Sequence, residues 1–258
     1  MADMFRLDGK VAVVIGGGGG IGKALALGLA RQGANVAIAS RNLQKLKEVA
    51  KQIKSDPEVK TEVKAFQVDI VDEQSVAQLA KQIVDAFGTV DILVNSQGQN
   101  FKRPMVDFPV ADWDFMFDVN VKGIMLACKE FGRIMVEKKS GKIINISSVA
   151  GTRGVPMAGN TGYCGTKGAV DQVTRALAYE WAAIPINVNA IGPSVILTEM
   201  MERALPPEAL EKAASIHPMG RLAQPEELIG ACVFLASPAS DYMTGQVVYV
   251  DGGRSAIA

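Results

Sequence analysis

Two side chains that can exchange a proton lie one helical turn apart in the sequence. Tyr163 and Lys167 are four residues apart, which places both on one face of a helix. A phenol titrates near pH 10 in water, but a nearby ammonium favours the phenolate and lowers the pKa of the phenol. The pair therefore predicts a catalytic acid and base, although the same spacing also occurs in ordinary helix-surface contacts.

Two serines follow a buried strand upstream of this pair. Residues 142–147 have the apolar pattern of a strand, and Ser147 and Ser148 stand at its end. A hydroxyl group there could donate a hydrogen bond to a substrate oxygen as charge develops on it. Serines also cap strand ends, and the residues alone do not choose between the two.

A run of glycines separates the first predicted strand from the first predicted helix. Gly16 to Gly20 are consecutive, and Gly22 follows after one residue. Without side chains the backbone can approach a pyrophosphate, and the next helix offers unpaired N–H groups and the positive end of its dipole. The position between strand and helix predicts a dinucleotide-binding loop rather than a flexible turn. No Lys-Ser or Lys-Thr closes the run, which disfavours a mononucleotide triphosphatase.

The residues after the second predicted strand bear on the cofactor. A carboxylate there would bind a ribose 2′-hydroxyl, but this chain has Ser40 and Arg41. Arginine matches a phosphate with a charge-assisted pair of hydrogen bonds, and serine can add another. The pattern favours NADP(H), with NAD(H) as the alternative. Arg41 could also be a solvated residue that opens a surface helix.

The elements that must position these residues alternate along the chain. Strands are expected at 11–15, 35–40, 64–67, 92–95, 142–147, 187–191 and 246–250, and helices at 21–32, 43–53, 76–86, 113–137, 163–183 and 225–235. Continuous Val/Ile strands are buried on both faces, so helices should cover both sides of a parallel sheet. We therefore predict an α/β fold: a single doubly wound Rossmann-type domain over 1–258 with seven parallel strands, and a small helical lid at 198–219. Ligands of such sheets bind beyond the carboxyl ends of the strands.

The composition excludes several classes of protein. Of 258 residues 48% are apolar and 21% charged, as in globular proteins, and 27 basic residues balance 27 acidic ones, which disfavours binding to nucleic acid or anionic membranes. The N-terminus lacks the layout of a signal peptide, and no apolar run is long enough to span a bilayer. Three widely spaced cysteines and the single His217 suggest neither disulfides nor a metal site. These features are typical of a cytoplasmic protein.

Taken together, the motifs resemble those of the short-chain dehydrogenase/reductase family over essentially the whole chain. The matching pieces are Gly16-x-x-x-Gly20-x-Gly22, Asp69, Asn95-Ser96-Gln97-Gly98, Asn120, Ser148, Tyr163-x-x-x-Lys167, the segment from Pro193 to Thr198, and Asp251-Gly252-Gly253. The resemblance implies a nicotinamide-dependent oxidoreductase that interconverts a secondary alcohol and a ketone by hydride transfer.

The resemblance also implies roles for individual residues. Tyr163 would be the acid and base, and Lys167 would lower its pKa and hold ribose hydroxyls of the cofactor. Ser148 would polarise the carbonyl, and Asn120 would anchor a water relay. The residues that would bind the cofactor are Gly16, Gly18, Gly19, Gly20, Ile21, Gly22, Ser40, Arg41, Asp69, Ile70, Asn95, Ser96, Gly98, Tyr163, Lys167, Pro193, Ile196 and Thr198.

Four features depart from the family pattern. Ile15 stands where threonine is usual, and Ser194 where glycine is usual. Ser96-Gln97 replaces the usual Asn-Ala and is expected to crowd the floor under the nicotinamide. The interval from Ser148 to Tyr163 is two residues longer than is common, which is expected to alter the shape of the substrate pocket.

The expected substrate is a polar small molecule. Several polar and cationic residues stand in segments that should border the pocket, and Gln99, Lys102, Arg103 and Asn160 are the candidates for substrate contact. Residues 101–109 are similar to those of gluconate 5-dehydrogenase-like members, which favours a sugar acid or polyol and a role in carbohydrate metabolism. Lys102 or Arg103 would lie near a carboxylate, unless both are surface loop residues.

Three further expectations complete the sequence analysis. The alternative activity is 3-oxoacyl-[acyl-carrier-protein] reductase, with Arg133, Lys138 and Lys139 as part of a basic face for the carrier. A non-catalytic nucleotide-binding scaffold is a third reading, because a fold does not fix a function. The resemblance also implies a homotetramer.

Overall fold

Seven parallel strands form one sheet in the computed structural model, which describes residues 3–154 and 159–256. Their order is β3-β2-β1-β4-β5-β6-β7, and every neighbouring pair is parallel. This is the doubly wound, Rossmann-type arrangement that the sequence predicts. In the described part of the chain, no helix combines the length and apolar character needed to cross a membrane.

The observed strands agree with the predicted ones to within one or two residues at either end. They are β1 Val11–Ile15, β2 Asn35–Ser40, β3 Val63–Gln67, β4 Ile92–Asn95, β5 Gly141–Ile146, β6 Ile186–Pro193 and β7 Val247–Val250. The strand predicted at 142–147 ends one residue earlier, at Ile146, so Ser147 and Ser148 both lie beyond the end of β5.

The helices agree with the sequence with two exceptions, and in one of them the helix predicted at 225–235 begins as a 3₁₀ turn, Pro225–Leu228, before an α-helix at Ile229–Ala236. They are α1 Gly20–Arg31, α2 Leu43–Lys54, α3 Glu73–Phe87, α4 Val110–Phe117, α5 Gly123–Lys138, α6 Thr161–Trp181, α7 Glu199–Ala204, α8 Pro207–Ser215 and α9 Ile229–Ala236. The other exception is the continuous helix predicted at 113–137, which is wrong: a π-helical turn, Asp118–Lys122, separates α4 from α5. Such a turn holds one extra residue and shifts the helix phase on either side, which apolar periodicity does not reveal.

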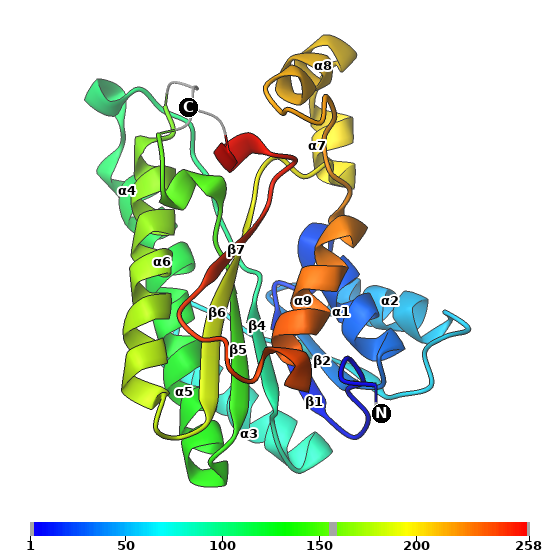
Figure 1. Ribbon diagram of the computed structural model, residues 1–258. Helices are drawn as coiled ribbons and strands as arrows, with labels where there is room; N and C mark the ends of the chain where they lie inside the picture. The colour runs from blue at the N-terminus through cyan, green and yellow to red at the C-terminus, as the bar shows by residue number, and fades with distance from the viewer. Residues whose placement is uncertain (1–2, 155–158, 257–258) are drawn as a thin grey trace.

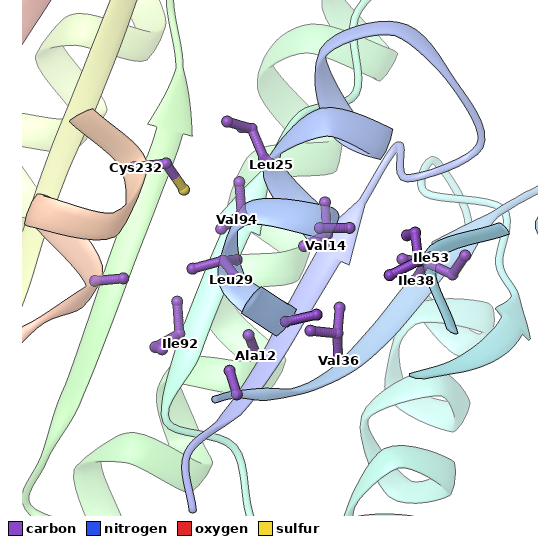
Figure 2. Close-up of a cluster of buried hydrophobic side chains, with 14 of the residues drawn as sticks. Ala12, Val14, Leu25, Leu29, Val36, Ile38, Ile53, Ile92, Val94 and Cys232 are labelled. Atoms are coloured by element: carbon purple, nitrogen blue, oxygen red, sulfur yellow. The ribbon is translucent and has the colours of Figure 1, made fainter. Parts of the chain in front are cut away.

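Helices cover both faces of the sheet (Figure 1). Helices α1, α2 and α9 pack on one face, and α3, α5 and α6 pack on the other. Figure 2 shows the first of these cores, where Val14 and Val94 from adjacent strands meet Leu25 and Leu29 of α1 and Cys232 of α9. Because consecutive strand residues point to opposite faces, β1 contributes Ala12 and Val14 to one core and its alternate residues to the other.

The strand order reverses between β1 and β4, which places a crevice at the carboxyl ends of these strands. Ile15, the last residue of β1, pairs with Asn95 of β4, and Asn95 pairs with Asn145 of β5. The segments that follow β1, β4 and β5 therefore begin side by side. They carry the glycine run, Ser96 to Asn100, and Ser147-Ser148.

The segment predicted as a lid contains two short helices. Figure 1 shows α7 and α8 together at one end of the molecule, beyond the carboxyl ends of the strands. Thr198 caps α7 by accepting a hydrogen bond from Met201 N, and Ile196 forms an isolated bridge with Ala223 that ties both ends of the segment together. The segment therefore stands beside the crevice.

Candidate active site

The glycine run forms a close turn that leaves room for a ligand. Gly16 has φ +84°, and a Cβ atom there would lie 2.7 Å from the backbone carbonyl carbon of Ser96. At Gly22 a Cβ atom would lie 2.3 Å from the carbonyl oxygen of Gly16. Only glycine fits either position, and both contacts hold the loop against its neighbours.

The N-terminus of α1 is free of the side-chain caps seen elsewhere. Gly19 precedes α1 and offers no side chain to its first N–H groups, whereas Asn42 and Asp72 cap α2 and α3. Unpaired N–H groups at a helix N-terminus bind anions, and the helix dipole adds to this attraction. The loop therefore fits a pyrophosphate, as the sequence predicts.

A cleft of about 770 Å³ extends from this loop toward β2 and β3. A second pocket of about 320 Å³ continues it toward Tyr163 and Lys167. Six residues line both, so the two form one continuous groove: Gly19, Ser96, Gln97, Gly98, Gln99 and Thr198.

Almost all residues predicted to bind the cofactor line this groove, and Asn95 is the exception. Asn95 is fully buried and donates hydrogen bonds to Asn145 Oδ1 (2.9 Å) and Cys128 Sγ (3.6 Å) below the groove. The groove-lining members are Gly16, Gly18, Gly19, Gly20, Ile21, Gly22, Ser40, Arg41, Asp69, Ile70, Ser96, Gly98, Tyr163, Lys167, Pro193, Ile196 and Thr198.

Cationic side chains surround the far end of the cleft. Arg41 is exposed there, and Gln67 Nε2 donates to its carbonyl oxygen (3.1 Å). The ammonium of Lys45 lies 3.3 Å from the position that a Cβ atom on Gly19 would occupy. Ser40 Oγ lies 3.3 Å from the position that a Cβ atom on Gly18 would occupy. Sequence reasoning missed Lys45. The sequence could have indicated Lys45 as a cofactor-binding candidate, because it lies in the first turn of the helix after β2, four residues beyond Arg41.

Ser148, Tyr163 and Lys167 line the smaller pocket together. Ser148 caps a short turn after β5 by accepting a hydrogen bond from Ala150 N (3.1 Å). The Lys167 ammonium lies 5.6 Å from the centre of the Tyr163 ring and donates to the carbonyl oxygen of Ile146 (2.7 Å). Helix α6 therefore directs both predicted groups into the groove, as their spacing predicts.

The electrostatics of the tyrosine differ from the sequence-based expectation. Burial raises the pKa of the Tyr163 phenol to about 12, and a hydrogen bond with Ser148 acts in the opposite direction. The predicted lowering by Lys167 is therefore wrong for the protein alone. The spacing of Tyr163 and Lys167 in the sequence shows that a charge is near the phenol, but it does not show that the phenol is shielded from solvent.

Lys167 is itself strongly affected by its surroundings. Burial lowers the pKa of its ammonium to about 8, and the charge of Asp171 partly opposes this effect. Asp171 is buried beside Lys167 and accepts a hydrogen bond from Ser147 Oγ. Both serines line the pocket, but the Ser147 hydroxyl pairs with this carboxylate, whereas the Ser148 hydroxyl bonds with the Tyr163 phenol. The structure distinguishes the two serines that the sequence left open.

A pH dependence of stability follows from the lowered pKa of Lys167. Between pH 8 and 10 the folded lysine loses its proton while the unfolded lysine keeps it, so folding becomes more favourable as pH rises. We expect the free energy of unfolding of the wild type to rise relative to that of Lys167→Met across this interval. Urea unfolding at pH 7, 8, 9 and 10 measures the difference. A difference that is constant with pH would contradict the assignment.

The π-helical turn positions Asn120. Its fully buried amide accepts a hydrogen bond from Gln99 N (2.7 Å) and donates to Gln99 O (2.8 Å) and Thr166 Oγ1 (3.0 Å). These bonds connect the loop after β4 to the first turns of α6. Asn120 does not line the groove, and the structure shows it as a link between the two segments that do.

The predicted substrate residues lie in different environments. Gln99 lines the groove, whereas Lys102 and Arg103 are exposed, and Arg103 Nε lies 3.7 Å from a carboxylate oxygen of Asp112. Asn160 is buried and accepts a hydrogen bond from Nδ2 of Asn100, a groove residue (3.2 Å). Part of the longer interval between Ser148 and Tyr163, residues 155–158, lies outside the described residues.

His217 lies in the predicted lid segment, after α8, and contacts Ser194, which lines the smaller pocket. Its Nδ1 donates to the carbonyl oxygen of Ala213 (2.9 Å), and its Nε2 is hydrogen-bonded with Ser194 Oγ (2.7 Å). This contact ties the end of β6 to the segment after α8. Among the described residues, no cluster of three potential ligand side chains could hold a metal ion.

Comparisons with known proteins agree with this geometry. Residues 16–255 match the family model described as enoyl-(acyl carrier protein) reductase. The chain is 36% identical over 252 residues to gluconate 5-dehydrogenase from Gluconobacter oxydans, covering 97% of this chain and 96% of the relative. It is also 36% identical over 248 residues to 3-oxoacyl-[acyl-carrier-protein] reductase from Thermotoga maritima, covering 96% and 98%.

A solved structure from Beutenbergia cavernae, described provisionally as an NAD(P)-dependent gluconate 5-dehydrogenase with bound NADP at low occupancy, has the same fold. It superposes with a TM-score of 0.91 at 35% identity and covers 99% of this chain and 100% of its own. The predicted resemblance is confirmed, and the chain belongs to the short-chain dehydrogenase/reductase family of oxidoreductases.

Proposed function

We propose that this protein is an NADP(H)-dependent oxidoreductase that interconverts a ketone and a secondary alcohol on a sugar acid, a polyol or a similar polar substrate. One observation carries the proposal: Ser148, Tyr163 and Lys167 share a pocket that is continuous with a glycine-lined, cation-rimmed cleft. Bound NADPH supplies the hydride in the direction of reduction.

The proton chemistry follows from the pocket. With a pKa raised to about 12, the Tyr163 phenol is protonated at neutral pH and is set to donate to a carbonyl oxygen. The Ser148 hydroxyl donates to the same oxygen and stabilises the charge that develops there. Lys167, held by Ile146, binds ribose hydroxyls, and Asn120 keeps the loop after β4 beside it.

The preference for NADP(H) rests on Ser40, Arg41 and Lys45. Arg41→Ala is expected to weaken NADPH binding about 10- to 100-fold, because a charge-assisted pair of hydrogen bonds to the 2′-phosphate is lost. Binding of NADH, which lacks that phosphate, should change less than about twofold. Fluorescence titration with each dinucleotide measures both effects. Lys47→Ala, which removes an exposed cation from α2 outside the cleft, is the control. Equal losses for NADPH and NADH would refute the assignment.

The substrate class rests on the polar lining near Tyr163, where Gln99, Asn100 and Ser194 border the pocket. A polyhydroxylated substrate needs such partners, since each buried hydroxyl left unpaired costs about 1 to 3 kcal/mol. The gluconate 5-dehydrogenase relative is named for a substrate of this kind. The test is a panel of keto-sugar acids, neutral polyols and acyl thioesters, assayed separately with NADPH and NADH. Turnover of thioesters alone would overturn the proposal.

The second candidate, 3-oxoacyl-[acyl-carrier-protein] reductase, has a relative of equal identity. The basic face that a carrier would need is weakened by internal pairing. Lys138 Nζ lies 2.6 Å from Asp91 and Arg133 lies 3.4 Å from Glu130. We therefore place this activity second, and a non-catalytic scaffold third. We also propose one domain over 1–258 with its lid at 198–219, and a cytoplasmic homotetramer.

A further inference from the structure

A buried carboxylate beside Lys167 has no part in the proposed proton transfer. Asp171 is 1% exposed on α6, and Ser147 Oγ donates a hydrogen bond to its Oδ1. Its other oxygen, Oδ2, is buried and has no hydrogen-bond partner among the described residues. Burial raises the pKa of this carboxyl group, and the bond with Ser147 and the charges of Arg175 and Lys167 oppose that effect. A buried carboxylate with an unpaired oxygen destabilises a fold, so packing alone does not account for Asp171.

The turn after β5 is shaped to admit this carboxylate. A Cβ atom on Gly151 would lie 2.5 Å from Asp171 Oδ2 and 2.9 Å from the carbonyl oxygen of Lys167, so a larger residue would push the turn away from α6. The backbone nitrogen of Ser147 donates to the carbonyl oxygen of Ile191 (2.8 Å), which joins the start of the turn to β6. The carboxylate is therefore enclosed between α6 and the turn, where it binds the Ser147 hydroxyl.

Ser147 stands between the two residues that hold the catalytic side chains. On one side of it, the carbonyl oxygen of Ile146 accepts a hydrogen bond from Lys167 Nζ (2.7 Å). On the other side, the Ser148 hydroxyl bonds with the Tyr163 phenol. Because these three residues are consecutive, a displacement of Ser147 would move both contacts at once. The hydrogen bond from Ser147 to the buried carboxylate therefore ties the end of β5 to the helix that carries both catalytic groups.

We propose that Asp171 is a positioning residue: through its bond with Ser147 it fixes the strand-end segment, residues 146–148, which holds the catalytic pair. Asp171 lines neither part of the groove, so it acts through Ser147 and not on the substrate or the cofactor. A misplacement of about 1 Å can lower turnover about 100-fold, so even a loosely held segment would be costly. This inference rests on the proposed function, because the strand-end segment matters only if Tyr163 and Lys167 are catalytic.

Removing either partner of the bond should have the same effect on catalysis. Asp171→Ala and Ser147→Ala should each lower the turnover number about tenfold and change the dissociation constant of NADPH less than about threefold. The double variant should also lose only about tenfold, because both substitutions remove one interaction, whereas independent roles would multiply to about 100-fold. Asp171→Asn keeps an oxygen acceptor for the Ser147 hydroxyl and should recover turnover to within about threefold of the wild type. Steady-state kinetics with the best substrate of the panel and fluorescence titration measure these quantities.

Hydrogen exchange tests the same bond without any turnover. In the free protein, Asp171→Ala and Ser147→Ala should each speed amide exchange at residues 147–150 about tenfold, because the turn opens more often. Thr174→Val is the matched control. Thr174 is also buried on α6, but its hydroxyl accepts a hydrogen bond from Asn145 Nδ2 (2.9 Å) within the core. This substitution should lower the thermal midpoint by about 2 to 4 °C and leave turnover and exchange at 147–150 within about twofold.

Each other outcome counts against the inference. Wild-type turnover in Asp171→Ala would show that the carboxylate does not position the catalytic pair, and a multiplied loss in the double variant would show that the two residues act separately. An Asp171→Asn protein as slow as Asp171→Ala would assign the effect to the charge and not to the hydrogen bond. An equal loss of turnover in Thr174→Val would assign it to weakened packing of α6.

The exchange measurement separates this inference from the proposed function. If the wild type turns over no member of the panel, the proposed function fails, and the exchange rates still decide whether Asp171 holds the strand-end segment. Faster exchange in both alanine variants would support that anchor, and unchanged exchange would overturn it whatever the kinetics show.

Discussion

Replacing Tyr163 by phenylalanine is expected to lower the turnover number about 10²- to 10⁴-fold, which is the usual contribution of a positioned general acid. The substitution removes the phenolic proton and the hydrogen bond with Ser148 but keeps the ring that fills the pocket. The dissociation constant of NADPH should therefore change less than about twofold. Steady-state kinetics and fluorescence titration of the same preparation separate these quantities.

Tyr179→Phe is the matched control for this substitution. Tyr179 lies on the same helix, α6, but is 90% exposed, so the loss of its hydroxyl should leave turnover unchanged. A Tyr163→Phe protein with wild-type turnover would show that another group donates the proton, and the role proposed for Tyr163 would have to be abandoned.

Gly22→Val is expected to weaken dinucleotide binding about 100-fold and to lower the free energy of unfolding by about 1 to 3 kcal/mol. A Cβ atom at this position would lie 2.3 Å from the carbonyl oxygen of Gly16, so the glycine loop must move by about 1 Å to restore an ordinary contact. That movement would displace the N–H groups that we propose bind the pyrophosphate. Titration with NADPH and urea unfolding measure the two effects.

Gly230→Ala provides the contrasting substitution. Gly230 lies in α9, and no atom lies within 4 Å of the position that its Cβ would take. Alanine should stabilise the helix by about 0.5 to 1 kcal/mol and leave NADPH binding unchanged. If Gly22→Val bound NADPH as well as Gly230→Ala does, the close turn after β1 would not be the binding loop.

Much of the architecture could be predicted because apolar runs mark the strands and turn-forming glycines directly follow the first of them. The apolar runs of β1 and β4 and the glycines after β1 give the strand, the turn and the start of α1 from the residues alone. The spacing of Tyr163 and Lys167 likewise places both on one helix face. These features depend on local geometry, which neighbouring residues determine.

The features that could not be predicted depend on segments far apart in the chain. The extra residue of the π-helical turn is stabilised by the bonds of Asn120 to Gln99 and Thr166, and no local pattern reveals them. The raised pKa of Tyr163 reflects the protein packed around it. The family resemblance implied that Asn95 binds the cofactor, yet its side chain donates to Asn145 in the core.

The π-helical turn also fixes how the chain can change length. Removing one residue between Phe117 and Gly123 would restore a regular helix but rotate α4 by about 100° relative to α5. Trp113 and Met116 would then lose their contact with Gly162. This contact is so close that a Cβ atom on Gly162 would lie 2.4 Å from Met116 Cε. Single deletions in this segment would thus disrupt the packing of α4 against α6. Insertions and deletions among relatives should therefore concentrate in other segments of the chain.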